Sequence, residues 1–309
     1  MSGLTGLTPV LRAVKLPEVA APREHPQGRM VELPGRGSTY VVDSGPVNGP
    51  TFILLHSVAC TGLLTWYPSL ETMRRFGRVV IFDQRGHGAG IPTSRILLED
   101  CADGVVAVAD ALGIDTFIPV GFSMGSLIAQ LAWRRHRDRV DALVLCAGAA
   151  TFAEAVPMRI GTSIFAGLLD AFSPHPGGPA VPDPDKQMSH PYLWALGEFR
   201  ATSVGAMLRT LAEIVRFDSR PWLSEIDVPT SVVIPSKDKA ISPKHQHWMA
   251  GQIRDCHIVT VDGGHACCTL GHRVFLPGLS AAVESVLDRV ERPTRRRRIG
   301  RRARRAIAG

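Results

Sequence analysis

The chain has no run of about 18 apolar residues, so the sequence predicts no membrane-spanning helix. The first residues, Met1 to Thr5, do not form a basic segment ahead of an apolar core, and no secretory signal is expected. No internal repeat is visible, which argues against a repeat architecture. At 309 residues, with 45% hydrophobic and 20% charged residues, the composition is that of a globular protein with one large core plus an insertion. We expect it in the cytoplasm.

Cysteines are few, and their spacing is not that of a metal site. The six are Cys60, Cys101, Cys146, Cys256, Cys267 and Cys268. Cys267 and Cys268 are adjacent, so they are not expected to pair with each other. Free thiols in a reducing compartment are the simplest interpretation. Cys267 follows His265 closely and could be a reactive thiol, but a packed small hydrophobic residue is the favoured interpretation.

Acidic residues are absent from positions 292–309, which hold nine arginines. Subtracting these nine charges from the net charge of +7 leaves −2, so the rest of the chain is nearly neutral. Such a block repels itself, and we expect a disordered tail. The tail could contact an anionic membrane surface. Binding to the phosphates of nucleic acid is less favoured, and a solvated tail without a dedicated role is the third interpretation.

Strands and helices alternate along most of the chain, which predicts a mostly parallel sheet with helices on both faces. Three strands are expected within residues 29–43 and 51–55. The later predicted strands are 78–82, 116–120, 141–145, 229–235 and 256–261, and the predicted helices include 62–74, 97–112 and the segment after Ser123.

The pattern changes between residues 150 and 222. Segments 153–171 and 203–217 are amphipathic and helical in spacing, and a stretch rich in proline and glycine lies between them. We predict a helical cap at 150–222, inserted after the sixth strand, with some apolar side chains lining an acyl pocket. The remaining predicted divisions are an irregular N-terminal arm (1–28), two core parts (29–149 and 223–291) and the arginine-rich tail (292–309).

The sequence around Ser123 predicts a nucleophile. Gly121-Phe122-Ser123-Met124-Gly125 is a G-x-S-x-G pattern between a β-rich segment and a helical one. Strand, sharp turn and helix form the nucleophile elbow of hydrolases. Flanking glycines keep Cβ atoms out of the tight turn, and the helix N-terminus offers N–H groups to a developing anion.

Two later segments supply a base and an acid. His265 follows a predicted strand and a glycine-rich loop, and it comes after Ser123 in chain order, as the hydrolase arrangement requires. Asp238 follows the predicted strand 229–235, where a carboxylate can orient the imidazole. Asp218 is a rival acid, although it precedes that strand. The other nearby histidines are interpreted as surface or packing residues; they are His245, His247, His257 and His272.

An oxyanion hole is expected after the apolar strand 51–55, in the loop His56-Ser57-Val58-Ala59-Cys60. We expect the backbone N–H groups of Val58 and Met124 to hold the negative oxygen. His56 is interpreted as a structural residue under this loop rather than as a second base.

These motifs resemble those of the α/β-hydrolase family over roughly residues 30–290, and the segment 133–140 is similar to actinobacterial members. The matching motifs are Leu55-His56 and its loop, the turn from Phe82 to Gly88, the elbow, Asp238 with Ser242-Pro243, and Gly264-His265. The resemblance implies an eight-stranded, mostly parallel sheet with an inserted cap, and a Ser123-His265-Asp238 triad that needs no metal or organic cofactor. Ser57 departs from the usual glycine, which leaves the geometry of the oxyanion loop open, because serine adopts positive φ reluctantly.

We therefore expect a serine hydrolase that cleaves a small carboxylic ester with an apolar group through an acyl-enzyme. A serine at the elbow argues against epoxide hydrolases and haloalkane dehalogenases, which use aspartate. A cofactor-free haloperoxidase, a carbon–carbon hydrolase and a non-catalytic ligand-binding protein remain as alternatives. The sequence gives no indication of the oligomeric state.

Overall fold

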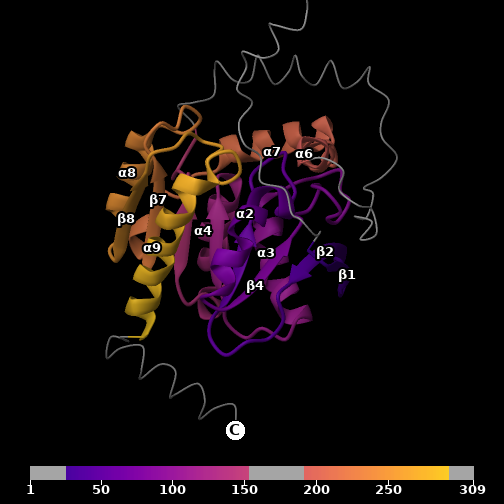
Figure 1. The fold of residues 1–309 in the computed structure, drawn as a ribbon, viewed down its shortest axis with the longest axis horizontal. Coiled ribbons are helices and arrows are strands. Elements are labelled where there is room, and N and C mark those ends of the chain that lie inside the picture. The colour runs from indigo at the N-terminus through magenta and orange to yellow at the C-terminus, as the bar shows by residue number, and fades with distance from the viewer. Residues whose placement is uncertain (1–25, 153–190, 292–309) are drawn as a thin grey trace, which may run out of the picture.

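A computed structural model of the chain describes residues 26–152 and 191–291 (Figure 1). Its centre is one eight-stranded sheet with the strand order β1-β2-β4-β3-β5-β6-β7-β8. The strands β1 and β2 are antiparallel to their neighbours, and all later pairs are parallel. The bounds are β1 Gly28–Leu33, β2 Gly37–Asp43, β3 Thr51–Leu55, β4 Arg78–Phe82, β5 Ile118–Phe122, β6 Leu143–Cys146, β7 Thr230–Pro235 and β8 Cys256–Val261. The predicted fold class is confirmed.

Helices cover both faces of this sheet. On one face, α3, α4 and α8 pack with the sheet in a first hydrophobic cluster, and α2 and α9 pack in a second cluster on the other face. The bounds are α2 Gly62–Arg74, α3 Leu98–Ala111, α4 Met124–Arg135, α6 Pro191–Arg200, α7 Val204–Arg216, α8 Pro243–Gln252 and α9 His272–Glu291, with short 3₁₀ turns η1 at Arg137–Arg139 and η2 at Leu223–Glu225.

The strand β3 explains why both faces are covered. Its side chains alternate between the two clusters: Ile53 and Leu55 belong to the first, and Phe52 and Leu54 to the second. All four are fully buried. A parallel strand with apolar side chains on both faces needs a covering layer on each side, so the sequence of β3 itself favours the three-layer arrangement.

The strand β5 differs from its predicted range by two residues. Phe117 makes only an isolated bridge to Val140, whereas pairing with β3 starts at Ile118 and continues to Gly121 opposite Leu55. The strand therefore extends into the glycine-containing motif and ends directly before Ser123. The parallel neighbours on both sides, rather than local β-propensity, determine where β5 ends.

The helices α6 and α7 lie between β6 and β7 in the sequence, and Figure 1 shows them across one end of the sheet. This is the carboxyl end of the parallel strands. Gly88 lies in the loop that follows β4, and its N–H donates at 3.2 Å to Oγ1 of Thr202, which lies between α6 and α7. The predicted helix at 203–217 is confirmed by α7. The predicted helix at 153–171, most of the N-terminal arm and the whole tail lie outside the described residues, and the division into core, cap and tails stays a prediction.

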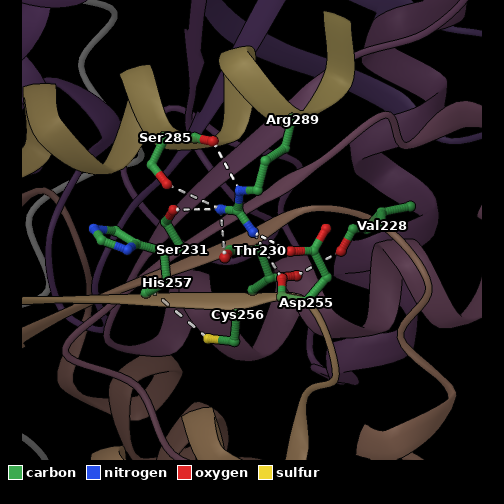
Figure 2. Close-up of polar contacts among 8 residues, drawn as sticks. All are labelled: Val228, Thr230, Ser231, Asp255, Cys256, His257, Ser285 and Arg289. Atoms are coloured by element: carbon green, nitrogen blue, oxygen red, sulfur yellow. Dashed lines mark hydrogen bonds and ion pairs between the residues drawn. The ribbon is translucent and has the colours of Figure 1, made fainter. Parts of the chain in front are cut away.

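Helix α9 is fixed to the opposite end of the sheet by Arg289 (Figure 2). The Arg289 guanidinium donates to Asp255 Oδ1 at 2.6 Å, to the Thr230 carbonyl at 2.9 Å and to Ser231 Oγ at 3.1 Å. Thr230 begins β7, and Asp255 directly precedes β8. One side chain thus joins the last helix to the amino ends of both strands.

Candidate active site

Ser123 occupies a strained backbone position between β5 and α4. Its φ is 53° and its ψ is −116°, and such a conformation costs a non-glycine residue about 1–3 kcal/mol. The chain on both sides of Ser123 is closely packed. A Cβ on Gly125 would lie 2.0 Å from the Leu55 carbonyl oxygen, and a Cβ on Gly121 would lie 2.1 Å from the Gly125 carbonyl oxygen. The glycines of the motif therefore permit the sharp turn that presents Ser123.

The structure brings Ser123, His265 and Asp238 together in one hydrogen-bonded chain. His265 Nε2 lies 3.0 Å from Ser123 Oγ, and His265 Nδ1 lies 2.8 Å from Asp238 Oδ2. The three residues follow β5, β8 and β7, which are parallel members of one sheet. Their carboxyl ends meet at the same edge, and this brings together residues that are 27 and 142 positions apart.

The partners of the imidazole determine which nitrogen carries the proton. An ionised carboxylate can only accept, so the nitrogen facing Asp238 must be protonated. His265 Nε2 is then free to accept the hydroxyl proton of Ser123, as a general base does. Phe122, the residue before Ser123, packs against the imidazole with a ring-centroid distance of 5.8 Å.

Asp238 is held by four donors. Its Oδ1 accepts from the backbone N–H groups of Ala240 and Ile241, each at 2.8 Å, and its Oδ2 accepts from His265 and from Gln246 Nε2 at 3.0 Å. The rival acid, Asp218, instead pairs with Arg220 at 2.7 Å on the surface.

The residues expected to form the oxyanion hole, Val58 and Met124, follow the neighbouring parallel strands β3 and β5. Met124 is the first residue of α4, so its N–H belongs to the first turn, whose N–H groups lack an acceptor within the helix. Val58 lies in a turn closed by the Cys60 N–H donating to the Ser57 carbonyl at 3.4 Å. The residue with positive φ in this loop is Ala59, at 63°, and not Ser57. Serine therefore replaces the usual glycine without left-handed strain, while the roles of Val58 and Met124 stay predictions.

His56 is enclosed beneath the oxyanion loop. Its Nδ1 donates to the Ser57 carbonyl at 2.8 Å, and its Nε2 accepts from the Gln84 N–H at 2.8 Å. Complete burial lowers its pKa to about 3, so the imidazole is neutral at physiological pH. Both nitrogens are occupied by the backbone, which suits a structural residue.

Asp83 connects the turn after β4 to the start of α2. Its two carboxylate oxygens accept from the Gly62 N–H at 2.7 Å and from the Ala89 N–H at 2.8 Å. Burial is the main cause that raises its pKa to about 7, and the nearby charge of Glu198 adds to the shift. Glu198 approaches from α6, and no motif in the sequence indicates this contact.

Metal and thiol chemistry find little support here. Within residues 26–152 and 191–291, no group of three or more His, Cys, Asp or Glu side chains is arranged to hold a metal ion. The Cys267 side chain is buried, and burial raises its pKa to about 12. A thiol with this pKa is a weak nucleophile, so the interpretation as a packed hydrophobic residue is favoured.

None of the helices within the described residues combines the length and the hydropathy that a membrane-spanning helix requires.

Known proteins resemble this chain in sequence and in fold. A family model described as alpha/beta hydrolase fold matches residues 50–172. The chain is 24% identical to 3-oxoadipate enol-lactonase 1 of Acinetobacter baylyi over 264 residues, which is 81% of this chain and 95% of that protein. It is similar in structure to an esterase from Exiguobacterium antarcticum (TM-score 0.67, 20% identity, 84% of this chain and 100% of the other). A bromoperoxidase from Bacillus anthracis is similarly related (TM-score 0.66, 18% identity, 84% and 100%).

The sheet order, the family model over residues 50–172 and these likenesses together show that the chain has the α/β-hydrolase fold. It is accordingly an enzyme of the hydrolase class.

Proposed function

We propose that the protein is a serine hydrolase that cleaves small carboxylic esters carrying an apolar group. The observation that carries this proposal is the hydrogen-bonded chain from Ser123 Oγ through His265 to Asp238, with distances of 3.0 and 2.8 Å. Few structural roles need a strained, nearly buried serine with an imidazole within hydrogen-bond reach of its hydroxyl.

The proposed reaction has two steps. His265 Nε2 takes the hydroxyl proton as Ser123 Oγ attacks the ester carbonyl, and the N–H groups of Val58 and Met124 stabilise the oxyanion. Collapse of this intermediate breaks the carbonyl–oxygen bond, the leaving alcohol receives the proton from His265, and an acyl-enzyme forms. Water, deprotonated by His265, then releases the acid and restores Ser123.

Two observations support an ester with an apolar group. The inserted helix α6 lies across the end of the sheet at which Ser123 follows β5, and it brings apolar surface there: its Trp194 packs against Tyr67 of α2 with ring centroids 5.8 Å apart. The related proteins include one named an esterase and one named an enol-lactonase, which indicates ester bonds in open and cyclic form.

The test is hydrolysis of p-nitrophenyl esters of increasing acyl length by the purified protein. We expect turnover of at least one ester, and Ser123→Ala should reduce it by at least about 10³-fold. A fluorophosphonate probe should label the parent and not this variant. Equal hydrolysis by parent and variant would reject Ser123 as the nucleophile.

A cofactor-free haloperoxidase activity is the second candidate, favoured by the likeness to the bromoperoxidase. The same serine and histidine would form a peracid from a short carboxylic acid and hydrogen peroxide, with release of water. Halide oxidation that needs peroxide, the acid and Ser123 together would support this activity. The carbon–carbon hydrolase alternative has no observation of its own.

The location and the tail are proposals as well. We propose a cytoplasmic enzyme whose residues 292–309 contact anionic membrane surfaces through arginine. The full chain and a chain ending at Glu291 should differ in binding to phosphatidylserine vesicles but not to phosphatidylcholine vesicles. Equal binding of both proteins would remove this role, and a parallel DNA-binding measurement tests the less favoured partner.

A further inference from the structure

Gln246 is a fully buried side chain on α8 that contacts the proposed catalytic acid. Its Nε2 donates to Asp238 Oδ2 at 3.0 Å and to the Ile241 carbonyl at 2.9 Å. The amide thus joins the carboxylate to the far side of its own loop. Gln246 lies beyond the Ser242-Pro243 start of α8, and nothing in the sequence pattern marks it as part of the site.

The orientation of this amide follows from its neighbours. Both groups that it faces, a carboxylate and a carbonyl, are acceptors, so the NH₂ must point toward them. The Gln246 Oε1 atom is consequently turned away, and it is buried without a hydrogen-bond partner in the described part of the chain. Burying an amide oxygen in this way is unfavourable. An apolar side chain of similar size would avoid that cost, so the donor has a purpose beyond packing.

We propose that Gln246 is a positioning residue that fixes Asp238 Oδ2 in line with His265. This inference rests on the proposed function of the Ser123 site. The main-chain N–H groups of Ala240 and Ile241 hold Oδ1, whereas Oδ2 accepts from His265 and Gln246. The imidazole changes its charge and its partners during turnover, whereas the Gln246 amide carries no charge and stays in place.

Gln246 also limits how strongly Asp238 attracts a proton on His265. A donor on Oδ2 withdraws negative charge from that oxygen, so the carboxylate stabilises the imidazolium less than an oxygen with a single partner would. Removing the donor leaves more charge facing Nδ1. In a variant without this donor we expect the imidazolium form of His265 to be favoured, so fewer molecules have a free Nε2 that can accept the serine proton.

The experiment compares Gln246→Met, which keeps the volume and removes the donor, with the matched control Gln130→Met. Gln130 is another fully buried glutamine, but its partners are Ser219 Oγ at 2.8 Å, the Ala149 carbonyl at 3.3 Å and Met249 Sδ at 3.6 Å, and none of them is a residue of the proposed triad. In Gln246→Met we expect kcat to fall about tenfold at neutral pH with KM little changed, as loss of one bond to a charged group implies. The acid limb of kcat/KM should move to higher pH, and the control should lose thermal stability without this movement.

A spectroscopic signal separates this inference from the proposed function. The proton on His265 Nδ1 gives a low-field ¹H NMR resonance, and it should shift in Gln246→Met but not in Gln130→Met. If the parent neither hydrolyses esters nor reacts with fluorophosphonate, the proposed function fails, and the resonance still tests the positioning role. Should Gln246→Met not fold, Gln246→Glu carries the test, because a second carboxyl beside Asp238 must also move the resonance.

A folded Gln246→Met protein with parental kcat, acid limb and resonance would overturn the inference. A change confined to KM would also overturn it, because a residue that only positions Asp238 does not contact the substrate.

Discussion

Thr61 donates its hydroxyl hydrogen bond to Glu198, and this contact connects the start of α2 to the inserted helix α6. Thr61 Oγ1 also accepts from the Leu64 N–H at 3.0 Å, so the same hydroxyl caps α2. The Glu198 charge acts on Asp83, which holds the next residue, Gly62, through its N–H. One carboxylate on the insertion is therefore linked to the turn that follows the oxyanion loop.

The first prediction concerns Glu198→Gln, which keeps an oxygen for Thr61 but removes the charge. The pKa of Asp83 is raised from 3.8 to about 7. Between these values the folded state holds a proton that the unfolded state has lost, so this contribution to stability decreases as pH rises through the window. Repulsion from Glu198 is felt when Asp83 is ionised. The variant should therefore gain stability relative to the parent at pH 8 and not at pH 5.

Thermal unfolding at the two pH values measures this difference. Glu213→Gln is the matched control, because Glu213 on α7 pairs with Arg216 at 2.8 Å and does not act on Asp83. It should change stability equally at both pH values. The same pH-independent change in Glu198→Gln would contradict the coupling.

The second prediction concerns the glycines of the elbow. Gly125→Ala should destabilise the fold by about 3 kcal/mol or more, because the new methyl group would meet the Leu55 backbone at 2.0 Å. Gly104→Ala is the control: its Cβ would meet no atom within 4 Å, and alanine in a helix should add about 0.5–1 kcal/mol of stability. Chemical denaturation gives both values. A Gly125→Ala protein of parental stability would show that the turn is looser than the structure indicates.

The third prediction concerns Arg289. Arg289→Met should cost about 1–3 kcal/mol, because it leaves the Thr230 carbonyl and the Asp255 carboxylate without their donor at the amino ends of β7 and β8. Ester hydrolysis below the unfolding temperature should be retained, since these contacts lie at the end of the sheet away from Ser123. Arg220→Met, which breaks an exposed pair with Asp218, should cost less than about 1 kcal/mol. Equal losses in the two variants would argue against the anchoring role.

The fourth prediction concerns the thiols. Burial raises the pKa of Cys60 to about 11 and that of Cys101 and Cys267 to about 12. At pH 8 a thiol of pKa 11 is ionised in only about one molecule in a thousand, so alkylation should be slow. Iodoacetamide should modify the native protein slowly and leave fluorophosphonate labelling intact, whereas all six cysteines should react in urea. Rapid loss of labelling together with modification of Cys267 would revive the reactive-thiol interpretation.

Much of the fold was predictable because its central strands are short segments made almost entirely of apolar residues. The segments 51–55 and 78–82 each contain four consecutive apolar residues after a polar first residue, and both match the observed β3 and β4. The helix at 62–74 also has its predicted bounds, although Pro68 lies within it. The start and end of β5 were predicted less well, because its register with β3 is a long-range property that a local pattern does not contain.

The candidate site was predictable where residues follow strands and not where they approach from helices. Ser123, Asp238 and His265 all follow strands, so the topology alone brings them to one edge. Gln246 and Glu198 reach the same region from α8 and α6. Their contacts depend on how each helix is rotated against the sheet, and no motif spacing records this angle. Asp218 is a poor candidate for the catalytic acid because its carboxylate pairs with Arg220, two residues away, at the surface.

The chain order of the site has a practical consequence. Ser123 precedes the insertion, while Asp238 and His265 follow it, and β6 pairs directly with β7 across that division. Two separately produced polypeptides, divided between Phe152 and Pro191, would each carry an incomplete set of reacting groups. Their re-association would rebuild the sheet and the site in one event, so ester turnover could report fragment complementation in this enzyme.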